Sequence, residues 1–139
     1  MRAKIILASL CVVAAPAWAQ GQQILHFDSS PQTRASTFSG NETRVAALNY
    51  VLSDCSSGPR PDIKILRSPA NGDLRFVPIT IPLARRATDP LAKCNGKIVN
   101  ALGVFYKSKE GFTGDDAFLI DADYKLGQVY RHSYIVSVR

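Results

Sequence analysis

The most informative segment for the fold is Gly111-Phe112-Thr113-Gly114-Asp115-Asp116-Ala117-Phe118. Glycine supplies backbone conformations of positive φ, and aspartate bonds nearby main-chain groups, so this composition predicts a turn. The residues that follow alternate: one face carries Phe118, Ile120, Ala122 and Tyr124, and the other carries Leu119, Asp121, Asp123 and Lys125. This period of two predicts a half-buried β-strand over residues 116–125.

Six further segments around this stretch carry strand signals, at residues 24–28, 43–53, 62–68, 74–81, 98–106 and 128–138. The segment 43–53 also fits a helix capped by Asn41, and strand is favoured because its surroundings are β-like. Residues 29–40 are rich in Ser, Thr and Pro and are expected to form a loop. Residues 84–97 are expected to be a long irregular connection.

Turn signals separate these segments. Ser68-Pro69-Ala70-Asn71-Gly72 predicts a hairpin, and Pro78 with Pro82 argues that the next strand lies at a sheet edge. About seven strands with frequent turns predict an all-β fold, an immunoglobulin-like two-sheet sandwich. A small barrel is the alternative. Three aromatic side chains are expected in the core of the sandwich, those of Tyr106, Phe112 and Phe118.

The N-terminus predicts export. Basic residues at positions 2 and 4 precede an apolar run over residues 5–15, and Ala17-Trp18-Ala19 is a small-x-small cleavage site. We therefore expect a signal peptide over residues 1–19, cut after Ala19, and a single domain over residues 20–139 in the periplasm or outside the cell. The apolar run is too short to span a bilayer, so no membrane-spanning segment is expected.

Two of the three cysteines, Cys55 and Cys94, lie in the expected mature chain. An even pair in an oxidising compartment predicts one disulfide, which closes a loop of about 40 residues. A redox pair or a metal site is the alternative. The sequence contains no C-x-x-C motif, and no histidine lies near either cysteine, so the structural disulfide is favoured.

The second half of the chain resembles the cadherin-like, immunoglobulin-like repeats of bacterial surface and secreted proteins. The resemblance covers residues 51–138 and rests on three ordered motifs: Pro69-Ala70-Asn71-Gly72, the run from Tyr106 to Phe118 with its Phe112-Thr113-Gly114-Asp115-Asp116 centre, and the closing Val136-Ser137-Val138. It implies a stand-alone sandwich domain stapled by a disulfide. Ser108 stands where the family has a proline, and Asp54 is all that remains of an acidic segment that can help bind calcium.

A calcium site is therefore a minor alternative, and its ligands would come from Asp115, Asp116, Asp121 and Asp123. Asp116 is expected instead to bond turn amides. His26 and His132 lack the spacing of a zinc site or a catalytic triad. No cofactor, metal or enzymatic activity is expected.

Basic residues gather in the connection over residues 84–97, where the candidate binding residues are Arg85, Arg86, Lys93 and Lys97. The charge of the chain is +6, which permits contact with anionic envelope polymers. No stacking-aromatic pattern accompanies it, so nucleic acid is not expected. We predict a monomeric, exported, non-enzymatic binding or adhesion module that contacts a protein or glycan of the bacterial cell envelope. The alternative is a small inhibitor of a hydrolase that acts through the 84–97 loop.

Overall fold

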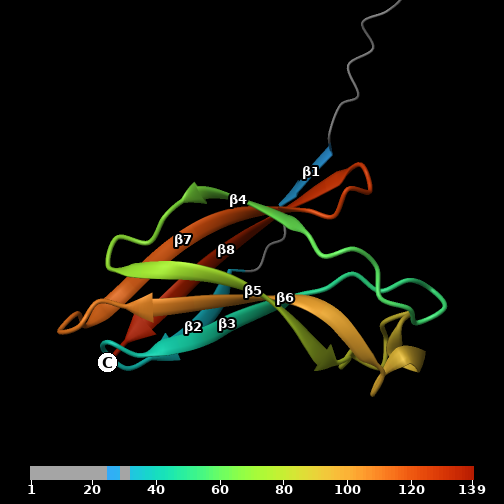
Figure 1. Cartoon of the computed structure of the whole chain (residues 1–139), viewed down its shortest axis with the longest axis horizontal. Helices are drawn as coiled ribbons and strands as arrows, with labels where there is room; N and C mark the ends of the chain where they lie inside the picture. The colour runs from blue at the N-terminus through green and yellow to red at the C-terminus, as the bar shows by residue number, and fades with distance from the viewer. Residues whose placement is uncertain (1–24, 29–31) are drawn as a thin grey trace, which may run out of the picture.

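The computed structural model describes residues 25–28 and 32–139, and the predicted signal peptide with its cut after Ala19 lies outside them (Figure 1). The larger of its two sheets is built around β8 (Gln128–Val138), which pairs antiparallel with β7 (Gly114–Asp123). β7 pairs in turn with β4 (Asp62–Arg67). On its other side β8 pairs parallel with β1 (Leu25–Asp28) and then with β2 (Thr33–Thr37), so two short strands share one edge.

The second sheet has three antiparallel strands. β6 (Ile98–Ser108) lies between β3 (Glu42–Leu48) and β5 (Gly72–Pro82). The long connection from β5 to β6 contains a single 3₁₀ turn, η1 (Ala92–Cys94). Consecutive described strands change sheet four times, from β2 to β3, from β3 to β4, from β4 to β5 and from β6 to β7. Within the described residues no helix is long and apolar enough to cross a membrane.

The prediction of an all-β, two-sheet sandwich is confirmed. The strand expected at residues 128–138 has those bounds, and the segment 43–53 is a strand in its first part, β3. β5 lies at a sheet edge, as its two prolines indicate. Gly111 and Gly114 have φ values of 79° and 122°, so the turn before β7 needs both glycines, as expected.

One expectation is wrong because the strand it missed has no sequence pattern of its own. Residues 29–40 are not all loop, since β2 lies within them. Its sequence, Thr-Arg-Ala-Ser-Thr, contains only one apolar residue, Ala35, which packs against the core. Five consecutive residues of β2 pair with β8 through the main chain. Main-chain pairing does not require a particular pattern of side chains, so the sequence gives little sign of this strand.

The expected hairpin at residues 68–72 is also wrong, since β4 and β5 belong to different sheets. The side chain of Asp116 explains the crossing. Its carboxylate accepts the N–H groups of Ala70 at 2.9 Å and Asn71 at 2.8 Å, and the Tyr106 hydroxyl donates to it at 3.0 Å. A Cβ at Gly72 would lie 2.4 Å from the Tyr106 ring, so only glycine lets the chain pass there.

Alternate residues of β7 and β8 build the core between the two sheets, as the sequence predicts. Phe118, Ile120 and Ala122 are fully buried, and Tyr124 is nearly so. The Phe118 ring stacks on that of Tyr134 with centroids 4.7 Å apart, and on that of Tyr106 at 6.5 Å. This aromatic stack joins β6 of one sheet to β7 and β8 of the other, so it holds the sheets together.

A second, smaller core fills the end of the sandwich where the long loops meet (Figure 1). It is formed by Val51, Leu83, Cys94 and Val99. The predicted disulfide between Cys55 and Cys94 is present, with Cα atoms 5.3 Å apart, and Cys94 is fully buried. The disulfide therefore joins the loop after β3 to the loop after β5 within one apolar cluster.

Candidate functional site

The four aspartates considered for calcium do not meet at one place. Asp116 points between the sheets and is 5% exposed. Asp115 accepts a hydrogen bond from the Ser137 hydroxyl at 2.7 Å. Asp121 forms a two-pronged ion pair with Arg131, at 2.9 and 3.1 Å. Each carboxylate therefore has its own partner, and Asp116 lies on the opposite side of β7 from Asp121.

Asp116 bonds main-chain amides as expected, but chiefly those of the crossing between β4 and β5. Burial acts to raise the pKa of this carboxyl. The hydrogen bonds from Asn71, Ala70, Tyr106 and Ala117 outweigh it, so the pKa lies below its usual value. Burial and the bond to Asp116 raise the pKa of Tyr106. These shifts accompany a structural hydrogen-bond network inside the sandwich.

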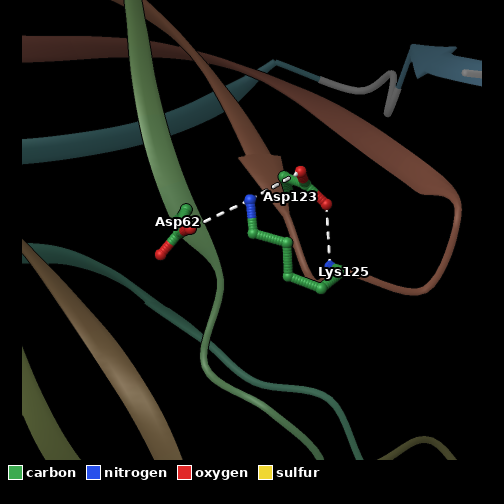
Figure 2. Close-up of polar contacts among 3 residues, drawn as sticks. All are labelled: Asp62, Asp123 and Lys125. Carbon is green, nitrogen blue, oxygen red and sulfur yellow. Dashed lines mark hydrogen bonds and ion pairs between the residues drawn. The ribbon is translucent and has the colours of Figure 1, made fainter.

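The fourth aspartate, Asp123, belongs to a small charged cluster at the end of β7 (Figure 2). The ammonium of Lys125 lies 3.0 Å from Asp62 and 3.1 Å from Asp123, and the Lys125 N–H donates to Asp123 at 2.7 Å. Lys125 has a φ of 60°, a conformation that these contacts help to hold. The main-chain and side-chain bonds from Lys125 lower the pKa of Asp123. The cluster ties the start of β4 to the β7–β8 turn.

A shallow groove of about 360 Å³ lies beside this cluster. Its lining residues are Asp62, Ile63, Lys64, Asp121, Asp123, Lys125 and Val129. Lys125 already fills the space between two of the carboxylates, and Arg131 pairs with the third. Over the described ranges, no set of three or more His, Cys, Asp or Glu side chains is placed to hold a metal ion.

His132 lies on the inward face of β8, as expected. Its ring lies 6.3 Å from that of Tyr134, and burial lowers its pKa. His26 belongs to β1, where its backbone pairs with Val129. His132 is therefore a half-buried residue that packs beside Tyr134.

Hydrogen bonds and the disulfide tie the two ends of the loop over residues 84–97 together. Leu83 and the residues at the far end of the loop exchange two main-chain bonds, Leu83 N–H to Lys97 at 2.8 Å and Gly96 N–H to Leu83 at 2.9 Å. The Asn95 side chain accepts from the Arg85 N–H at 2.7 Å and donates to the Arg85 carbonyl at 3.0 Å. Together with the disulfide, these bonds close the loop at its base.

The four basic side chains predicted for this loop play two roles. Arg86, Lys93 and Lys97 are exposed. Arg85 is half-buried, and its guanidinium donates to the Asn49 side chain at 3.0 Å. This bond links the loop over residues 84–97 to the loop that follows β3. The loop is also hollowed on one side by a cavity of about 430 Å³, which Arg85 and Arg86 line with Ala84, Thr88, Asp89 and Pro90.

We call the two loops joined by the disulfide, residues 49–61 and 83–97, the disulfide end. Five basic residues and two aspartates lie in it, namely Arg60, Arg85, Arg86, Lys93, Lys97, Asp54 and Asp89. Its net charge of +3 is half of the chain's +6. Arg60 donates to the Ala101 carbonyl and the Asn100 side chain, both at 3.1 Å, and Arg85 bonds Asn49. These partners are neutral, so the positive charge is not compensated by them.

A comparison of the chain with protein-family models, with curated proteins and with solved structures finds no match. The resemblance to cadherin-like repeats accordingly remains a prediction from three motifs.

Sequence reasoning missed the residues that support the basic loop. Asn95 and Asn49 are single asparagines without a motif, and their partner Arg85 lies 10 and 36 residues away. The pairing of Asp62 with Lys125 spans two strands of the larger sheet and was also missed. The sequence pattern places Lys125 at the end of the expected strand over residues 116–125 and gives no information about its partner.

Proposed function

We propose that this protein is a non-enzymatic binding module of the bacterial cell envelope, exported by a cleaved signal peptide, that contacts an anionic partner through the disulfide end. The single observation that carries the proposal is the basic loop over residues 84–97, whose base is closed by hydrogen bonds and by the disulfide. A loop that is ordered before binding loses little conformational entropy when it binds. The exposed charges of Arg86, Lys93 and Lys97 on such a loop favour a partner of negative charge.

The cadherin-like character of the domain belongs to the same proposal. Three motifs support it, in the order in which that family carries them, together with the two-sheet arrangement of strands. Single sandwich domains of this kind host many unrelated functions, so the function is argued from the loop and not from the fold.

The experiment that tests this function is a pull-down from envelope extracts with the native protein and with Lys93→Glu/Lys97→Glu. Capture of an envelope polymer or surface protein that the double variant loses supports the proposal. The matched control is Arg67→Glu, which reverses an exposed charge at the opposite end of β4. Equal capture by the native protein and the double variant would contradict the role of the loop.

Inhibition of a hydrolase is the second candidate, because a rigid exposed loop with Arg85-Arg86 can also block an active site. One contact weighs against a substrate-like inhibitor. The Arg86 carbonyl accepts the Asp89 N–H at 2.9 Å, so the chain turns at this point and does not present an extended segment. Capture of a hydrolase that loses activity in the same pull-down would favour inhibition over adhesion.

A further inference from the structure

Exposed aliphatic side chains lie within the positively charged disulfide end, at Leu52, and directly beside it, at Ile98. Ile98, directly after Lys97, is 66% exposed, and Leu52, three residues before Cys55, is 43% exposed. Both lie next to buried residues of the small core, since Val99 and Val51 belong to it. The exposed side chains are thus held on a rigid part of the molecule.

Main-chain bonds fix the position of both aliphatic residues. The Leu52 N–H donates to Ser56 at 3.0 Å, and the Leu52 carbonyl accepts the Cys55 N–H at 2.9 Å. Ile98 pairs with Pro82 at the end of the β5–β6 ladder. Single exposed aliphatic residues are common on protein surfaces, so the argument rests on their combination with a net charge of +3 in the adjoining loops.

We propose that the disulfide end docks on the surface of an anionic lipid membrane, an inference that rests on the proposed function and names its partner. Acidic lipid headgroups attract Lys and Arg side chains, and the boundary between headgroups and acyl chains accepts aliphatic ones. A solvated acidic polysaccharide would pair with the charges and would leave Ile98 and Leu52 in water. Charge and apolar exposure together therefore favour a lipid surface.

The experiment is co-sedimentation of the native protein with two kinds of vesicle, phosphatidylcholine alone and phosphatidylcholine mixed with phosphatidylglycerol. We expect binding to the mixed vesicles that weakens as salt is added, because screening reduces the attraction. Lys97→Glu should lower the partition coefficient about tenfold, since each basic side chain near such a surface contributes about fivefold and the reversal adds repulsion.

Matched variants separate the charge contribution from the apolar one. Ile98→Thr keeps a β-branched residue in the strand and should weaken binding several-fold. Ile65→Thr, on β4 and 44% exposed, and Arg67→Glu are the controls and should leave binding close to that of the native protein. Circular dichroism of each variant checks that the fold is retained.

Three outcomes in which vesicles are bound would overturn the inference. They are equal binding to both kinds of vesicle, losses of the same size in the two controls, and binding that soluble acidic polysaccharide abolishes and Ile98→Thr leaves unchanged. If vesicles are not bound while envelope extracts still yield a partner that depends on Lys93 and Lys97, the membrane inference fails and the proposed function stands. If both assays are negative, the proposed function fails as well.

Discussion

At the scale of single residues, Asp116 shows how one side chain sets the path of the chain. Its side chain is buried, and its carboxylate accepts hydrogen bonds from the N–H groups of Ala70 and Asn71, directly before β5. These two bonds hold the chain where it crosses from one sheet to the other. A carboxylate accepts hydrogen bonds through both of its oxygens, as Asp116 does here, whereas an asparagine side chain accepts only through its single carbonyl oxygen. This explains why an acidic residue lies between two apolar sheets.

We expect Asp116→Asn to destabilise the protein by about 2 kcal/mol, because the new amide group meets an N–H donor and leaves it unsatisfied. Denaturant unfolding measures the change. The neighbouring Asp115→Asn is the matched control, since Asp115 is exposed and bonds one hydroxyl, and it should unfold close to the native midpoint. Equal losses in the two variants would contradict the assigned role.

The lowered pKa of Asp116 also predicts how stability depends on pH. Its pKa in the folded protein is below the value of about 3.9 expected when unfolded. The resulting stabilisation is fully present above the unfolded pKa and is lost as pH falls through the folded pKa. Thermal melts from neutral pH down to acid should therefore show a smaller loss for Asp116→Asn than for the native protein below about pH 4. Parallel curves would refute this assignment.

At the scale of elements, the loop over residues 84–97 is held by specific contacts, although its only regular structure is one 3₁₀ turn. Its base is closed by backbone pairing at Leu83, by Asn95 and by the disulfide. Ser57 and Arg60 of the partner loop bond Asn100 and Ala101, on the part of β6 that β3 does not reach. The two loops thus complete the sheet as well as the small core.

Removing the disulfide should be costly. In the chain-entropy model, closing a loop of 39 residues stabilises the fold by about 4 kcal/mol. Cys55→Ala/Cys94→Ala should lower the melting temperature by about ten degrees or more. Differential scanning calorimetry, with thiol titration of the native protein as control, checks this. An unchanged melting temperature would show that the cluster of apolar residues alone holds the loops.

Asn95 should control how rigid the basic loop is. Asn95→Ala removes both side-chain bonds to the Arg85 backbone, so the Arg85-Arg86 segment should open more often. Limited digestion with trypsin reports the opening as faster cleavage within the loop. Thr88→Ala, an exposed change in the same loop, should digest at the native rate. If Asn95→Ala also digests at that rate, the loop is held by its other contacts.

At the scale of the whole molecule, the sandwich has unequal strands. β6, β7 and β8 lie inside their sheets and carry the aromatic stack, whereas β4 is an edge strand with mostly exposed side chains. A bulge between Ile65 and Arg67 and the charges of β4 discourage pairing with other chains. The inner strands β6, β7 and β8 therefore carry the packed core, whereas β4 is a solvent-exposed edge.

Native-state hydrogen exchange should follow this division. Amides of β6, β7 and β8 should be the slowest to exchange, those of β4 should be fast, and the disulfide end should lie between them. Exchange measured by nuclear magnetic resonance on the oxidised protein gives each rate. If the amides of β4 were as protected as those of β6, β4 would not be an open edge.

Sequence pattern was sufficient to predict the elements whose side chains alternate and the turn that needs glycine. It predicted β7 and β8, the buried face from Phe118 to Tyr124, the edge position of β5 and the pairing of Cys55 with Cys94. These features depend on the order of residues that are close together in the chain, or on the number of cysteines. They can therefore be predicted from the sequence alone.

The remaining features depend on contacts between residues that are distant in the chain. β2 forms because β8 offers it a row of main-chain partners, and residues 68–72 cross between sheets because Asp116 holds them. Asn95 and Asn49 support Arg85, and Lys125 joins Asp62 to Asp123, through contacts that span up to 63 residues of sequence. Hydrogen bonds and ion pairs of this kind depend on distance in space, and local sequence carries no record of that distance.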